Sequence, residues 1–178
     1  MIKFIVALLM GTTLLLAEGF SLKSNDILGQ LSNEQVFNGF GCKGENISPA
    51  LEWTNAPKGT QSFAITMYDK DAPTGSGWWH WVVFNIPAEV TSLAKNSGDT
   101  LANLMPKDAV QSMTSYGKSG FGGACPPLGH GPHQYVITVY ALGTKKLDLD
   151  ANASPALVGY MLNANTLAKA SVIAYYAR

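Results

Sequence analysis

Apolar and polar positions alternate along three segments in the middle of the chain, and this alternation predicts β-strands. The segments are residues 61–68, 78–86 and 134–142. In an extended chain, alternate residues of the second segment fall on opposite faces. One face would carry His80, Val82, Phe84 and Ile86, and the other would carry Trp79, Trp81 and Val83. Because both faces are mainly apolar, the pattern indicates a sheet buried on both sides, as in a β-sandwich.

One helix is predicted near the C-terminus. Ser154 is a suitable N-cap and Pro155 a suitable first helical residue. The expected apolar stripe consists of Leu157, Met161, Ala164 and Ala168. Residues 171–178 follow as a β-rich segment, which either returns as an edge strand or covers the sheet.

The composition predicts a single β-rich domain over residues 20–178. The chain has 178 residues, of which 47% are hydrophobic, and this is enough for one sizeable core. Twelve basic residues balance twelve acidic ones, and no cluster of lysine or arginine stands out. We therefore expect no nucleic-acid partner.

The N-terminal residues are predicted to form an export signal. Lys3 supplies a positive charge, residues 4–17 form an apolar run, and Ala17-Glu18-Gly19 matches a small-residue cleavage pattern. Cleavage would remove residues 1–19, leave no stable membrane span and place the protein in the periplasm or outside the cell. The alternative is that the run remains as a buried N-terminal helix or as an uncleaved anchor.

The two cysteines, Cys42 and Cys125, are candidates for a disulfide. In an oxidising compartment they can pair, whereas in the cytosol they would remain two small buried thiols. The sequence leaves both outcomes open, because it does not show whether their Cα atoms are close enough.

Two aspartates and a histidine lie around one predicted turn. Asp69 and Asp71 stand where the first strand gives way to a turn rich in proline and glycine, and His80 lies inside the next strand. An imidazole on an apolar face needs a partner for its nitrogen atoms, so His80 is a candidate for a binding site. Asp71 has a second interpretation, in which its carboxylate caps backbone N–H groups of the turn.

A second segment repeats this arrangement. A glycine-rich loop over residues 116–131 runs into the third strand, where His133 and Tyr135 are two residues apart and point to the same side. The loop includes Gly123 and Pro126, and its consecutive N–H groups are candidates for an anion-binding nest. Together the two segments predict one shared pocket.

A metal site is an alternative use of the same residues. His80, His130 and His133, with an aspartate, are ligand types that zinc accepts. None of them stands in a short HxH or HExxH arrangement that would preset the geometry. The sequence also contains no GxSxG elbow and no phosphate-binding GxxxxGK[ST] loop. We expect no metal and no cofactor.

Four segments, in this order, resemble the phosphatidylethanolamine-binding protein family, in its bacterial Raf kinase inhibitor-like branch. They are CKGENISPALEW, DKDAPTGSGWWHWVVFNIP, GGACPPLGHGPHQY and LAKASVIAYYAR. The resemblance covers residues 22–178. It implies a mainly β Greek-key sandwich with a few peripheral helices, and a small pocket for phosphate-type anions and phosphoethanolamine head groups.

The resemblance also implies which residues line the pocket. Asp69, His80 and His133 match the family's pocket residues, and Tyr135 and the backbone of residues 122–127 lie beside them. The chain departs from the family pattern at several positions. Lys70 replaces the proline of the usual DPD, Gln134 replaces the arginine of the usual HR pair, and Asn165 stands where bacterial relatives often have histidine.

These observations predict an exported, non-enzymatic binding protein, with a regulatory or inhibitory protein-binding role as an addition. Two alternatives remain: a hydrolase that acts on a phosphoester with the same His/Asp pocket, and a protein-interaction module whose pocket is vestigial. A carboxylate beside the histidines should favour their protonated form, so we expect anion binding to strengthen on mild acidification.

Overall fold

The computed structural model describes residues 19–178, and the predicted signal segment therefore lies outside the described residues except for its last position. The described chain is mostly β-structure, as predicted, with one α-helix and one short 3₁₀ helix, η1 (Asn33–Gln35). The strands that form the small sheet are β1 (Ser21–Lys23), β2 (Leu51–Thr54) and β5 (Ser92–Leu93). The strands that form the large sheet are β3 (Ser62–Asp69), β4 (Trp78–Pro87), β6 (Val110–Gln111), β7 (His133–Leu142) and β8 (Thr166–Tyr176). The α-helix is α1 (Pro155–Asn165).

The large sheet is antiparallel and has the order β6-β4-β3-β7-β8. β3 lies at its centre, between its hairpin partner β4 and the distant β7, so its residues are buried almost without interruption. The C-terminal segment returns as the edge strand β8 along β7. This strand begins earlier than residue 171, directly after the helix.

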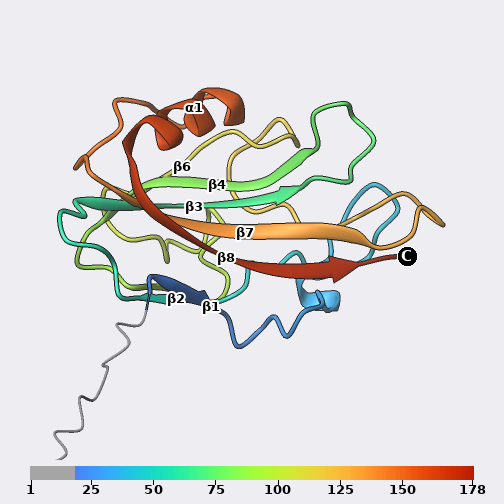
Figure 1. The fold of residues 1–178 in the computed structure, drawn as a ribbon. Helices are drawn as coiled ribbons and strands as arrows, with labels where there is room; N and C mark the ends of the chain where they lie inside the picture. The colour runs from blue at the N-terminus through green and yellow to red at the C-terminus, as the bar shows by residue number, and fades with distance from the viewer. Residues whose placement is uncertain (1–18) are drawn as a thin grey trace, which may run out of the picture.

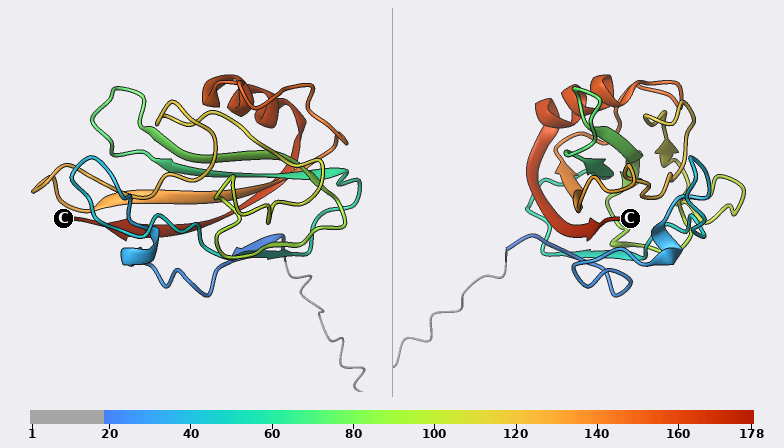
Figure 2. Two further views of the ribbon diagram at one scale, coloured as in Figure 1. Left: turned by 180° about the vertical axis from the view of Figure 1, so that it is seen from behind. Right: turned by 90° about the vertical axis from the view of Figure 1, so that its right-hand side faces the viewer.

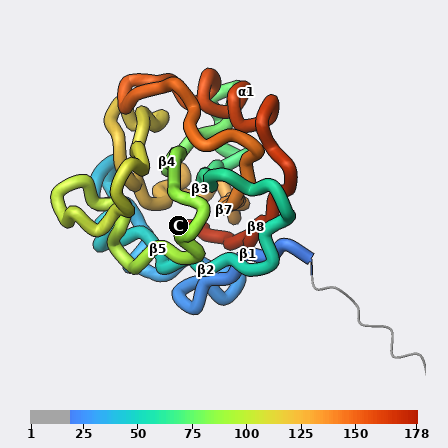
Figure 3. Tube along the Cα trace, turned by 90° about the vertical axis from the view of Figure 1, so that its left-hand side faces the viewer, coloured from blue at the N-terminus to red at the C-terminus, as the bar shows by residue number. Residues whose placement is uncertain are grey.

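Both faces of the large sheet are covered (Figures 1 and 2). On one face the small sheet packs through Trp53, Leu51 and Leu93 against apolar side chains of β3, β4 and β7. On the other face lies α1, and Figure 3 shows the helix and the small sheet on opposite sides. No helix within residues 19–178 is long and apolar enough to cross a bilayer.

Two irregularities in β4 correct the predicted assignment of its faces. Met67 pairs with Trp81 but the next residue, Tyr68, pairs with Trp79, so His80 is an extra residue, as in a β-bulge. A second register shift surrounds Asn85, whose φ is 59°. Each extra residue reverses the alternation that follows. Ile86 therefore packs with Trp81 and Val83 under the small sheet, while Trp79 packs with Val82 and Phe84 on the helix side.

The predicted helix stripe was wrong by one position. Ser154 caps α1 as expected, with Oγ accepting from the Leu157 amide at 3.3 Å. The buried residues are Val158 and Leu162, and Leu157 is 45% exposed. The helix has apolar side chains on every side, so its pattern contains little information about which side faces the sheet. Ala168 lies beyond the helix, in β8.

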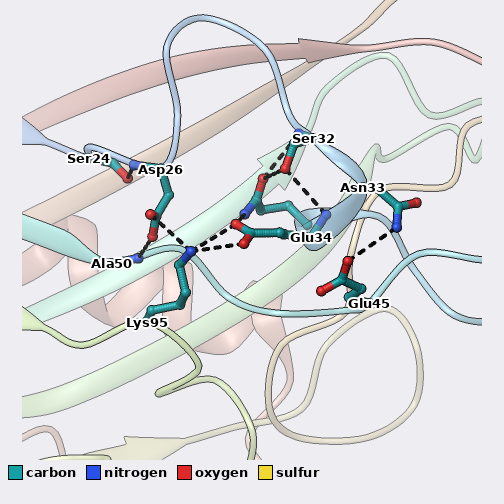
Figure 4. A network of polar contacts seen from close by, with 9 residues as sticks. Ser24, Asp26, Ser32, Asn33, Glu34, Glu45, Ala50 and Lys95 are labelled. Atoms are coloured by element: carbon teal, nitrogen blue, oxygen red, sulfur yellow. Dashed lines mark hydrogen bonds and ion pairs between the residues drawn. The ribbon is translucent and has the colours of Figure 1, made fainter.

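Lys95 connects three segments on the side of the small sheet (Figure 4). Its Nζ lies 3.3 Å from Asp26 Oδ1 and 2.9 Å from Glu34 Oε2. The other oxygen of Asp26 accepts from the Ala50 amide at 2.7 Å. This network positions η1, and the residues that follow η1 contact the glycine-rich loop through the Phe37 amide, which donates to the Ala124 carbonyl at 2.9 Å.

Candidate functional site

The predicted site residues come from three strands that meet at one end of the large sheet. Asp69 is the last residue of β3, His80 is the third residue of β4, and His133 is the first residue of β7. Antiparallel pairing brings the end of β3 beside the starts of β4 and β7. This end lies near the C-terminus, on the right in Figure 1.

Asp69, His133 and His130 form a continuous hydrogen-bonded chain. Asp69 Oδ2 lies 2.7 Å from His133 Nδ1, and both side chains are almost completely buried. Asp69 Oδ1 accepts from the Asp71 amide at 2.9 Å. His133 Nε2 lies 2.7 Å from Nδ1 of His130, an exposed residue of the preceding loop. Both ring nitrogens of His133 therefore have partners within the protein.

His80 is held differently. Its Nδ1 lies 2.7 Å from the Gly122 carbonyl oxygen, and a carbonyl can only accept, so Nδ1 carries the hydrogen. Burial lowers the pKa of His80 from 6.5 to about 4, although the Gly122 carbonyl and the Asp69 carboxylate act in the opposite direction. The ring is neutral near pH 7, and Nε2 is then a hydrogen-bond acceptor. This Nε2 is buried and has no partner within the protein.

Tyr135 supplies a second unpartnered polar atom. It lies opposite Asp69 in the β3–β7 pairing, and its ring centroid is 5.1 Å from that of His80 in an edge-to-face arrangement. Its hydroxyl group is buried without a hydrogen-bond partner, and burial raises the pKa of this phenol. Buried polar atoms are rarely left unpaired, so the free Nε2 of His80 marks a position where a ligand could donate a hydrogen bond.

A hollow of about 210 Å³ opens at this end of the large sheet. Its polar lining includes Asp69, His80 and His133, and its apolar lining includes Phe40, Trp78, Tyr116, Pro126 and Pro127. Tyr116 contacts the other two aromatic side chains: its ring centroid is 5.3 Å from that of Trp78 and 5.7 Å from that of Phe40. Phe40 was not a sequence candidate, because it lies outside the segments that carry the aspartates and histidines of the site.

A disulfide stands at the rim of the hollow. Cys42 and Cys125 are bonded in the structure, with their Cα atoms 5.9 Å apart and a sequence separation of 83. Cys125 itself lines the hollow, and the bond holds the loop of Phe40 against the glycine-rich loop. The bond thus connects two segments that both contribute to the rim.

The predicted anion nest was wrong for the first part of the glycine-rich loop. The amides of Phe121, Gly122, Gly123 and Ala124 donate to acceptors within the protein. The Gly122 amide bonds the His80 carbonyl at 2.8 Å, and the Gly123 amide bonds Asn46 Oδ1 at 2.7 Å. Pro126 and Pro127 have no amide hydrogen. The loop shapes the hollow and offers few backbone donors to a ligand.

Asp71 connects the turn to β7 instead of lining the hollow. Its Oδ2 accepts from the Gln134 amide at 2.8 Å, and its Oδ1 lies 2.8 Å from Lys70 Nζ. The Lys70 hydrogen bond, followed by the Gln134 amide, lowers the pKa of Asp71. The Gln134 side chain donates to the Tyr175 hydroxyl at 2.9 Å, on the outside of the sheet.

The expectation that a carboxylate keeps the pocket histidines protonated is wrong for His80. Asp69 bonds His133, while desolvation dominates at His80 and favours its neutral form. Across residues 19–178, no group of three or more His, Cys, Asp or Glu side chains is arranged as metal ligands would be.

The fold and this hollow define a class of protein: a mainly β protein of two sheets and one α-helix, with a small pocket at one end of its main sheet. The model of the phosphatidylethanolamine-binding protein family matches residues 29–177, and the chain belongs to this family. The family prediction made from the four sequence segments is thereby confirmed.

Similar proteins agree with this assignment. The UPF0098 protein YbcL of Escherichia coli is 53% identical over 162 residues, which is 90% of this chain and 88% of the relative. The UPF0098 protein YbhB of Escherichia coli is 47% identical, over 87% of this chain and 98% of the relative. The crystal structure of YbcL, described as a member of the mammalian PEBP family, superposes with a TM-score of 0.88, covering 90% of this chain and 99% of that one.

Proposed function

We propose that this protein is an exported, non-enzymatic binding protein whose end pocket holds a small phosphate-type anion or the phosphoethanolamine-like head group of a phospholipid. The observation that carries the proposal is the convergence of Asp69, His80 and His133, from three strands, at one hollow with an aromatic rim. One buried atom there, His80 Nε2, lacks a partner that a ligand would supply.

The size of the hollow supports a head group as the part that is bound. About 210 Å³ accommodates a group of a few heavy atoms but not an acyl chain as well. The family description names phosphatidylethanolamine, whose head group combines a phosphate with an amine. A lipid would therefore leave its chains outside, over the exposed Phe40 and Pro127.

Titration calorimetry with phosphoethanolamine tests the proposal. We expect binding to the wild type and a loss of at least about tenfold in affinity for His80→Ala, because a directional hydrogen bond and its pocket wall are removed. Leu101→Ala, at a position 86% exposed, is the matched control and should bind as the wild type does. Absence of binding to the wild type, or equal affinities for His80→Ala and Leu101→Ala, would overturn the proposal.

The hydrolase alternative lacks a nucleophile bonded to a base. His133 bonds Asp69 and His130, and His80 bonds a backbone carbonyl, so within the described residues neither ring is paired with a serine, threonine or cysteine. The same preparations, incubated with phosphomonoesters and phosphodiesters, give the decisive comparison. Turnover that disappears in His80→Ala would favour the hydrolase.

A further inference from the structure

One asparagine of the chain is followed by a glycine. Asn38-Gly39 stands between Phe37 and Phe40, and no other asparagine of the sequence precedes a glycine. Figure 1 shows this loop in light blue at the end of the molecule that carries the C-terminus. The loop is closed at its base, because the Gly44 amide donates to the Phe37 carbonyl at 2.9 Å. The pair is therefore held beside the rim of the pocket hollow, which Phe40 lines.

The Asn38 side chain and the Gly39 amide are both free within residues 19–178. Asn38 is exposed and lines a polar hollow of about 390 Å³, so water reaches its side-chain amide. Neither this side chain nor the Gly39 N–H forms a hydrogen bond with another described residue. Glycine also has no side chain to shield its nitrogen. A nucleophilic nitrogen and a carbonyl carbon thus stand on adjacent residues without a competing partner.

We propose that Asn38-Gly39 is a site of spontaneous modification, at which Asn38 is converted to aspartate and isoaspartate. The Gly39 nitrogen attacks Cγ of Asn38 and forms a C–N bond, while its proton and the side-chain NH₂ group leave as ammonia. Water then opens the resulting five-membered imide at one of its two carbonyl groups. The net change is the exchange of NH₂ for OH, and water is the only co-reactant. This inference goes beyond the proposed function and does not depend on it.

Packing keeps a glycine at position 39. A Cβ atom there would lie 2.7 Å from the Phe37 ring, which is buried against Tyr116 with the ring centroids 4.4 Å apart. A larger residue at this position would shield the attacking nitrogen, but it would have to displace the Phe37 ring. The packing that holds the rim in place therefore also retains the reactive pair.

Two other asparagines illustrate how the fold protects this residue type. Asn96 precedes the small residue Ser97, but the Ser97 amide donates to the Ala94 carbonyl at 3.1 Å and its side chain is buried. Asn163 lies inside α1, where the amide that follows it is committed to the helix. Asn96 is the internal comparison for Asn38, because the two differ in whether the next amide is free.

Isoaspartate at position 38 would change the rim of the pocket. Its main chain runs through the former side chain, so one additional carbon atom enters the loop after Phe37. The loop has little room for this length, because the bonded Phe37 carbonyl and the Cys42–Cys125 disulfide hold its two ends. Phe40 lies between these two anchors and lines the hollow. The added carbon should therefore displace Phe40, whereas aspartate at position 38 adds a charge and leaves the main chain unchanged.

Incubation of the folded protein in ¹⁸O-labelled water at mildly alkaline pH tests the proposal. Conversion in this water adds about 3 Da instead of about 1 Da, so new product is distinguished from product present at the start. After reduction and tryptic digestion, tandem mass spectrometry of peptides 24–43 and 96–107 locates the label. We expect label at Asn38 and none at Asn96. The rate should rise by up to about tenfold per pH unit, because the attacking nitrogen must lose its proton.

Asn38→Gln is the matched control, because its side chain would have to close a larger ring. This variant should acquire no label at position 38, while its peptide 96–107 behaves as in the wild type. Wild-type protein unfolded in urea shows how fast the same sequence reacts without the fold. Absence of label at Asn38 in the folded protein would overturn the proposal, whether or not the unfolded chain reacts. Equal labelling of Asn38 and Asn96, or of the wild type and Asn38→Gln at position 38, would overturn it as well.

Titration with phosphoethanolamine measures the effect on the rim. The isoaspartate form, separated by chromatography and identified with synthetic peptide standards, is compared with the wild type and with Asn38→Asp. We expect the isoaspartate form to bind about threefold more weakly, since one apolar wall of the hollow moves, and Asn38→Asp to bind as the wild type does. Equal affinities for the isoaspartate form and Asn38→Asp would overturn the effect on the rim. Absence of binding in all three would overturn the proposed function, whereas the mass label is read without any ligand.

Discussion

Nδ1 of the exposed His130 lies 2.7 Å from Nε2 of the buried His133. Since His133 Nδ1 bonds the Asp69 carboxylate, the exposed ring is connected to a buried carboxylate through one intervening imidazole. A hydrogen bond between two imidazoles needs one N–H and one lone pair, so the protonation of each ring constrains the other. This arrangement keeps His133 from bonding a ligand directly and makes it a support for Asp69.

His130→Ala should lower the free energy of unfolding by about 1 kcal/mol, because it removes the partner of a buried ring nitrogen. Urea unfolding at pH 7 measures the change, and nitrogen chemical shifts of the histidine rings report the altered environment of His133. Leu128→Ala, in the same loop and 81% exposed, is the control and should be close to wild type. Equal unfolding free energies for the two variants would contradict this role for His130.

The depressed pKa of His80 predicts a loss of stability in mild acid. Unfolded His80 takes up a proton below pH 6.5, whereas the folded protein does so only near pH 4. Between these values the unfolded state binds more protons, so stability falls as the pH is lowered through the window and is unaffected above it. The full shift corresponds to about 3 kcal/mol.

Urea unfolding of the wild type and of His80→Gln at pH 7.0, 5.5 and 4.5 isolates this contribution. The carboxylates of the protein titrate in the wild type and in the variant alike. The difference between the two profiles of unfolding free energy against pH therefore reports the contribution of position 80. We expect the variant to lose about 2.5 kcal/mol less than the wild type between pH 7.0 and pH 4.5. Parallel profiles would show that the pKa of His80 is not depressed in the folded protein.

Reduction of the Cys42–Cys125 bond should destabilise the protein and weaken binding at the pocket. The closed loop of 83 positions corresponds to about 4.5 kcal/mol in the chain-entropy treatment of the unfolded state. The loop of Phe40 would also lose its attachment to the rim. Unfolding and phosphoethanolamine titrations with and without dithiothreitol measure both effects. The Cys42→Ala/Cys125→Ala variant should be insensitive to the reductant. An equal response of the variant and the wild type would show that the effect of the reductant does not come from this disulfide.

Gly123 is required for close packing. A Cβ atom at this position would overlap backbone atoms of residues 35–37, which cannot move aside as a side chain can. Gly123→Ala should therefore destabilise the protein by about 3 kcal/mol. Gly159→Ala is the matched control, since its Cβ would meet nothing within 4 Å and alanine favours the helix by roughly 0.5–1 kcal/mol. Thermal and urea unfolding would contradict the prediction if both variants behaved alike.

Local pattern determined much of this protein. Alternation located β3, β4 and β7 to within a residue or two, and Ser154-Pro155 marked the start of α1. Four ordered segments indicated the family. These features depend on residues close in the chain, whose spacing and backbone preferences act before any tertiary contact forms.

Tertiary structure decided how those elements present their side chains. The bulge at His80 and the register shift at Asn85 place residues of β4 on faces that strict alternation does not predict. Packing against the large sheet determines which side of α1 is buried. At the site, the sequence supplied Asp69, His80 and His133 as candidates. Their partners, Gly122 for His80 and His130 for His133, became visible only in three dimensions. Hydrogen bonding and desolvation depend on atoms brought together from distant parts of the chain, and these contacts determine which ring nitrogens are free and whether they carry a proton.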